Sequence, residues 1–168
     1  MSNQNKGPIC IRSGSIQVQN ATDNKLLGFI APTFYFEVYG YVTNDISQSL
    51  KITFPYDITT PFSITTMNGP NATFPFFGAI VRATSDSDNI GTNTSNYYFI
   101  GITAETSPNT SHINGSNSYT AKTTLIKAIE SAIWSISSSK ILTAQWINTD
   151  CSKPTTYIIY IVKNNSCL

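Results

Sequence analysis

The chain has few ionisable side chains. Only 11% of its 168 residues are Asp, Glu, Lys or Arg, against a usual ~25%, and His112 is its single histidine. Acid–base and metal chemistry need titratable groups gathered in one pocket, so we expect a protein that is not an enzyme and has no cofactor. The formal net charge of +1 also argues against a nucleic-acid partner, which requires a basic stripe.

Long apolar runs are also missing. No run approaches the ~20 residues of a membrane span, so we expect no membrane-spanning segment. The first residues, MSNQNKGP, lack the apolar core of a signal peptide. The localisation stays open between the cytoplasm and secretion with a leader removed.

Cysteine is scarce, with Cys10, Cys151 and Cys167 as the only three. An odd number allows at most one intramolecular disulfide. A bridge from Cys10 to Cys151 or Cys167 would link the two ends of the chain, and the alternative is three reduced thiols. No Cys-x-x-Cys pair occurs, which argues against a zinc site.

Patterns typical of β-strands dominate what is present. Short runs alternate polar and apolar residues between turn-forming residues. Residues 76–81 are apolar throughout, which predicts a strand buried on both faces, with Gly78 marking a bulge or a close approach. The expected strands are residues 15–19, 26–30, 33–42, 50–54, 62–67, 76–81, 97–102, 131–136, 141–147 and 155–162. They predict one all-β domain over residues 1–168, an antiparallel, jelly-roll-like β-sandwich of about ten short strands.

The other segments are assigned by composition. We expect residues 1–13 to form an N-terminal arm. Residues 103–118 are almost wholly Ser, Thr, Asn, Gly and Pro, so we expect them to form a long polar loop. Residues 122–136 fit both helical and strand spacing. We expect a short helix or an irregular turn up to about residue 128, and then a strand at 131–136, so that the chain has at most one short helix. His112 lies in the polar loop, where we expect no apolar group to hold it or tune its pKa, so we assign no catalytic residue.

One short motif contains alternating oxygen ligands. Asp86, Asp88 and Asn89 precede Gly91 in the sequence DSDNIG, an arrangement found in calcium loops. However, Ile90 stands where a ligand oxygen is needed, and no glutamate follows at the required spacing. Asn89 and Gly91 are equally explained as turn formers, so Asp86, Asp88 and Asn89 are candidates for a calcium site, with a polar turn as the alternative.

Aromatic residues beside polar ones are candidates for ligand binding. An aromatic ring stacks on the C–H face of a sugar while amides meet its hydroxyls. The alternative is that these rings belong to the core, which is favoured for the two tryptophans. The candidates are Tyr97, Tyr98, Tyr119, Trp134 and Trp146.

Three pairs of segments carry a family resemblance. They are GSIQVQN with LGFI (residues 14–20 and 27–30), FGAIV with SDSDN (77–81 and 85–89), and ESAIW with LTAQWINTD (130–134 and 142–150). Together they resemble a group of short β-rich basidiomycete fungal proteins, some described as the small non-catalytic subunit of dimeric laccase. The resemblance implies an accessory-subunit-like role without copper ligands.

The sequence therefore predicts a non-enzymatic interaction or structural protein. Low charge and exposed strand edges favour association, so we expect a homo-oligomer or a complex with a partner protein. The alternative is a carbohydrate-binding lectin with glycans as ligands.

Overall fold

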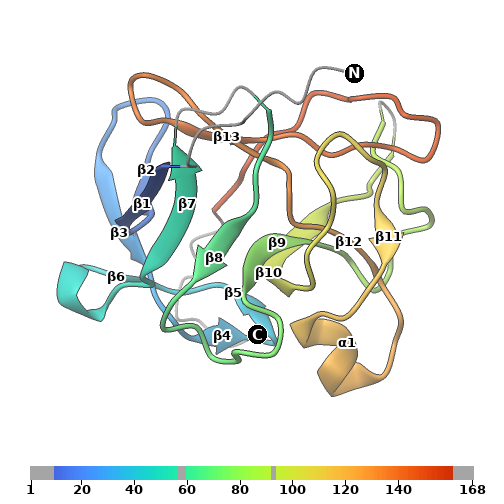
Figure 1. The fold of residues 1–168 in the computed structure, drawn as a ribbon, viewed down its shortest axis with the longest axis horizontal. Coiled ribbons are helices and arrows are strands. Elements are labelled where there is room, and N and C mark those ends of the chain that lie inside the picture. The colour runs from blue at the N-terminus through green and yellow to red at the C-terminus, as the bar shows by residue number, and fades with distance from the viewer. Residues whose placement is uncertain (1–9, 57–59, 92–93, 161–168) are drawn as a thin grey trace, which may run out of the picture.

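The computed structural model describes residues 10–56, 60–91 and 94–160 (Figure 1). These residues form fourteen strands, one 3-10 helix and one α-helix, which confirms the predicted all-β fold. Most strands are only two or three residues long, so they are more numerous than the expected ten. The elements are β1 (Cys10–Gly14), β2 (Gln17–Gln19), β3 (Leu26–Ile30), β4 (Phe34–Tyr35), β5 (Val38–Tyr39), β6 (Val42–Thr43), η1 (Ile46–Gln48), β7 (Ile52–Tyr56), β8 (Ile64–Thr66), β9 (Phe76–Val81), β10 (Tyr98–Thr103), β11 (Ile113–Asn114), α1 (Ser118–Thr123), β12 (Ala128–Glu130), β13 (Trp134–Ile136) and β14 (Leu142–Ala144).

Seven antiparallel strands form the main sheet, in the order β1-β7-β8-β9-β12-β11 with β10 also paired to β9. Figure 1 shows β7, β8 and β9 crossing the middle of the molecule. One edge of β9 pairs with β10 along its whole length, and its other edge is shared between β8 and β12. Three small sheets, β2-β3-β6, β4-β5 and β13-β14, complete the described fold. The antiparallel arrangement is as predicted, and the jelly-roll-like sandwich stays a prediction.

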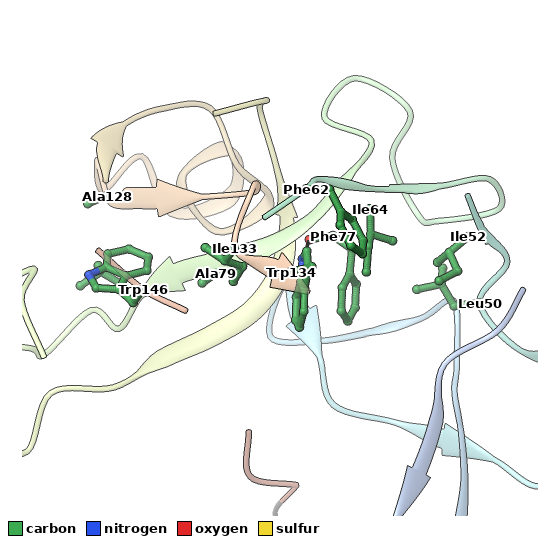
Figure 2. Close-up of a cluster of buried hydrophobic side chains, with 11 residues drawn as sticks. Leu50, Ile52, Phe62, Ile64, Phe77, Ala79, Ala128, Ile133, Trp134 and Trp146 are labelled. Atoms are coloured by element: carbon green, nitrogen blue, oxygen red, sulfur yellow. Dashed lines mark hydrogen bonds between the residues drawn. The ribbon is translucent and has the colours of Figure 1, made fainter. Parts of the chain in front are cut away.

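Strand β9 is buried on both faces, as its apolar sequence predicts. Phe77 and Ala79 lie in the main core cluster together with Trp134 and Trp146 (Figure 2), and Val81 belongs to the same cluster. Gly78 marks a close approach, because a Cβ there would lie 2.7 Å from the backbone oxygen of Glu130.

The helix lies earlier in the chain than expected. The side chain of Asn117 caps α1 by accepting a hydrogen bond from the Thr120 N–H, and the helix ends at Thr124 in the left-handed region. Leu125 and Ile126 are exposed and do not form a helical face. The prediction of at most one short helix is confirmed. Of the two alternatives for the stretch up to residue 128, the structure has an irregular segment at residues 124–127, because the left-handed Thr124 ends the helix.

Two predicted coil segments contain strand instead. Residues 10–13 of the expected arm lie in β1, because their backbone pairs with β7 in a continuous register; residues 1–9 lie outside the described residues. The expected loop at 103–118 begins in β10, includes β11 and ends in α1.

Two predicted strands are interrupted or absent. Residues 33–42 are split by a two-residue turn at Phe36 and Glu37, which joins β4 to β5. Residues 155–160 have no assigned secondary structure, and residues 161–162 lie outside the described residues. Their composition favours a strand, yet no neighbouring strand in the described part of the chain pairs with them.

Candidate functional site

Trp146 and Tyr98 form the centre of an aromatic cluster. Their rings stack with centroids 3.9 Å apart, and both side chains donate hydrogen bonds to the backbone oxygen of Asp88, at 3.1 and 3.0 Å. Burial raises the pKa of the Tyr98 hydroxyl, and the nearby charges of Glu130 and Asp88 act in the same direction. The cluster thus holds the 86–91 turn against the end of β10.

His112 belongs to the same cluster. Its ring stacks on the Trp146 ring, with the two centroids 5.3 Å apart. Its Nε2 lies 3.2 Å from the hydroxyl oxygen of Thr149. The expectation that no apolar group holds His112 is wrong, because Trp146 reaches it from a distant part of the sequence. Burial lowers the pKa of the imidazole, against the opposing effect of Asp88, and so favours the neutral form of the ring.

Glu130 is a buried acid beneath this cluster, with 3% of its surface exposed. Its Oε1 accepts a hydrogen bond from the Ile147 N–H at 3.0 Å. Burial raises the pKa of Glu130 to about 8, although the backbone N–H groups of Ile147 and His112 favour the ionised form. The carboxyl group joins β12 to the segments at 147 and 112, which gives it a structural role.

The 86–91 turn is fixed by hydrogen bonds within the protein. Asn89 Oδ1 accepts from the backbone N–H and the hydroxyl of Thr149, at 2.8 and 3.0 Å. The Asp86 backbone N–H donates to Asn96 Oδ1. No group of three or more His, Cys, Asp or Glu side chains capable of holding a metal occurs within the described residues. Because the Asn89 oxygen is already used, this geometry favours the polar turn over the calcium site.

The remaining aromatic candidates do not converge on one site. Trp134 is 1% exposed and donates from Nε1 to the backbone oxygen of Phe77, so it belongs to the core, as does Trp146. Tyr97 is exposed, with the Arg82 guanidinium 4.8 Å above its ring. Tyr119 lies half-buried on α1. The structure brings together only Tyr98 and Trp146, through a stack that the sequence does not predict.

Two of the cysteines are described, and both are free and exposed. Cys10 begins β1, and Cys151 lies in the turn after β14. The bridge considered between these two is therefore not formed. Cys167 lies outside the described residues.

The segment of residues 155–160, here called the C-terminal segment, is the most apolar exposed part of the described chain. Tyr157, Ile158 and Ile159 are all exposed, Tyr157 and Ile159 at 79% each, whereas Thr156 and Tyr160 are half-buried. Residues 156–159 line a cavity of about 80 Å³ together with Tyr98 and Trp146. The structure records no backbone hydrogen bond from this segment to the other described residues.

A sheet edge is also open. Strand β1 ends the main sheet, pairs only with β7, and has all five residues exposed. Its outer backbone groups have no strand partner in the part of the chain that the structure describes. An unpaired edge of this kind is a template for a further strand.

Comparisons with known proteins give no family. No family model matches the chain, and no curated protein or solved structure matches it significantly. The resemblance to small laccase subunits therefore stays a prediction. Among the described residues, no helix is long and apolar enough to cross a membrane.

Sequence reasoning missed how these residues come together. Glu130 and His112 are distant in sequence, and only the pairing of β12 with β9 and β11 brings them close to Trp146. A glutamate within an otherwise apolar and small-residue run, AIESAIW at 128–134, was the one available signal, because an acid in a core strand must be paired or neutralised.

Proposed function

We propose that this chain is a non-enzymatic interaction protein that associates with a further protein chain, a second copy being the first partner to test. The observation that carries the proposal is the C-terminal segment. It is a strongly β-forming run in which Tyr157, Ile158 and Ile159 are exposed, and it has no recorded backbone hydrogen bond to the other described residues. Exposed strands with free backbone groups bind by adding to the edge of another sheet.

The chain also contains an acceptor for such a strand. The outer edge of β1 is exposed along its whole length. A donor segment on one copy and an open edge on the next make a head-to-tail contact. The exposed rings and aliphatic side chains would supply apolar burial at about 25 cal/mol per Å², in addition to the backbone hydrogen bonds.

The groups suited to acid–base catalysis already have structural partners, which supports a role without catalysis. His112 stacks on Trp146 and bonds to Thr149. Glu130 is almost fully buried and accepts from Ile147. A substrate atom would have to displace these partners to reach either group.

Light scattering over a wide concentration range tests the proposal. We expect the mass of the native protein to rise with concentration, and Ile159→Lys to keep it monomeric because a charge would enter the contact. Ile126→Lys is the matched control, since Ile126 is similarly exposed, at 70%, but lies outside the segment. A native protein that stays monomeric and carries no partner when purified from its source would refute the proposal.

A further inference from the structure

A pocket of about 220 Å³ lies between the β4–β5 turn, α1 and the segment at residue 70. It is separate from the C-terminal segment and from the Trp146 cluster. Phe34 and Pro70 form its apolar wall, and Glu37, Asn71 and Lys122 are its longer polar side chains. The volume is below the roughly 300–1,000 Å³ of pockets for drug-sized ligands, so the pocket has room for a single small ring.

The aromatic wall is anchored to the core. The ring of Phe34 packs edge-on against Tyr39, with their centroids 5.1 Å apart. The ring centroids of Tyr39 and Phe77 are 5.2 Å apart, and those of Phe77 and Trp134 are 5.1 Å apart. This row of rings runs from the pocket to a tryptophan that is 1% exposed. Phe34 is thus held in place before a ligand arrives, which lowers the entropy cost of binding.

The turn beside the pocket is strained. Phe36 and Glu37 have φ values of 49° and 65°, a conformation that hairpin turns usually fill with Asn-Gly. The Ser118 hydroxyl donates to the Glu37 backbone oxygen at 2.6 Å and so holds the turn against α1. Strain of this kind persists where the surroundings impose it and is concentrated at binding sites.

The polar side chains of the pocket are available to a ligand. Asn71 Oδ1 accepts from the Thr73 N–H at 2.8 Å, which orients the amide and leaves Nδ2 without a partner among the described residues. The structure records no ion pair between the Glu37 carboxylate and Lys122, although both line the pocket. The site therefore offers one strong acceptor and two donors beside an aromatic ring.

We propose that this pocket binds one neutral pyranose sugar. The C–H face of the sugar packs on Phe34, one hydroxyl donates to Glu37, and others accept from Asn71 and Lys122. Glu37 disfavours phosphorylated or acidic ligands by charge repulsion. Because Lys122 is exposed, an ion pair with it would add little, which favours a sugar over a small zwitterion.

Titration with neutral hexopyranoses, followed by NMR of the full-length protein, tests this inference. The protein is made without N-glycosylation, because Asn71-Ala72-Thr73 is itself an acceptor sequence. We expect saturable shifts at millimolar sugar in the amides of residues 34–37 and 118–122. Asn71→Asp keeps the hydrogen bond to Thr73 but removes the amide donor, so affinity should fall roughly tenfold, as for one lost hydrogen bond. Glu37→Gln should weaken binding similarly.

The chain supplies a matched control for the amide. Asn20-Ala21-Thr22 repeats the same three residues, and Asn20 Oδ1 accepts from the Thr22 N–H at 2.8 Å. Asn20→Asp should leave sugar binding unchanged. The inference is overturned if no hexopyranose shifts the NMR signals of the amides of residues 34–37 and 118–122. It is also overturned if the Asn71→Asp and Asn20→Asp variants bind the sugar with equal affinity. Neither result depends on the association state, which Ile159→Lys changes separately.

Discussion

Thr106 and Ser131 exchange hydrogen bonds through their side chains. The Thr106 N–H donates to Ser131 Oγ at 2.8 Å, and the Ser131 N–H donates to Thr106 Oγ1 at 2.9 Å. Both residues are buried. This reciprocal pair ties the polar segment after β10 to the turn between β12 and β13, so that segment is an ordered part of the core.

Removing one hydroxyl of this pair should destabilise the fold. Thr106→Val removes the acceptor for the Ser131 N–H and leaves it buried without a partner, which costs about 1–3 kcal/mol in free energy of unfolding. Urea unfolding measures the change. Thr110→Val is the control, since Thr110 is exposed and bonds only to the nearby Ser107 oxygen; its effect should stay within about 0.5 kcal/mol. Equal effects for the two variants would contradict the structural role of the pair.

Glu130 should make stability depend on pH. Its folded pKa of about 8 lies above the ordinary 4.5. Between these values the unfolded chain has released the proton while the folded protein retains it, so the free energy of unfolding falls as pH rises. Glu130→Gln removes this titration and keeps an oxygen acceptor for the Ile147 N–H. The stability difference between the native protein and the variant should therefore shift by up to about 4 kcal/mol from pH 5 to pH 8.

Chemical unfolding at several pH values tests this shift. Taking the difference between the two proteins matters because His112, with its lowered pKa, acts in the opposite direction: its contribution to stability is lost as pH falls. Glu105→Gln, at an exposed acid, is the control and should leave the pH profile unchanged. Parallel profiles for the native protein and Glu130→Gln would show that the carboxyl group titrates normally.

Replacing Thr103 with valine should stabilise the protein. Its side chain is fully buried in β10, and its Oγ1 has no hydrogen-bond partner among the described residues. Thr103→Val replaces an unsatisfied hydroxyl with a methyl group of similar shape, so we expect about 1 kcal/mol of stabilisation. Thr65→Val in β8, at a half-buried position, controls for the β-propensity of valine. Destabilisation by Thr103→Val in urea unfolding would mean that the hydroxyl has a partner, such as a bound water.

The all-β class could be predicted from local patterns, and the cluster around Trp146 could not. Runs such as 76–81 are apolar throughout, and the β13–β14 hairpin follows from its two strands and a Ser-rich turn. Local composition does not predict whether a segment finds a distant strand to pair with. Residues 155–160 have the composition of a strand but no partner among the described residues. Residues Cys10–Gly14 lack polar–apolar alternation, yet they pair with β7. The same reason hides the stack of His112 on Trp146, which depends on long-range packing.

The turn at Phe36 and Glu37 links stability to the proposed sugar site. Phe36→Asn should stabilise the protein by about 0.5–1 kcal/mol, because Asn tolerates a positive φ and the Phe36 ring is 76% exposed. Glu37→Gly should relieve strain in the same way but also remove the carboxylate from the pocket. We therefore expect both variants to raise the melting temperature, and only Glu37→Gly to lose sugar binding. If Phe36→Asn abolished binding as well, the ligand would depend on the exposed ring and not on the Phe34 wall. If neither variant were stabilised, the left-handed turn would not be a source of strain in the folded protein.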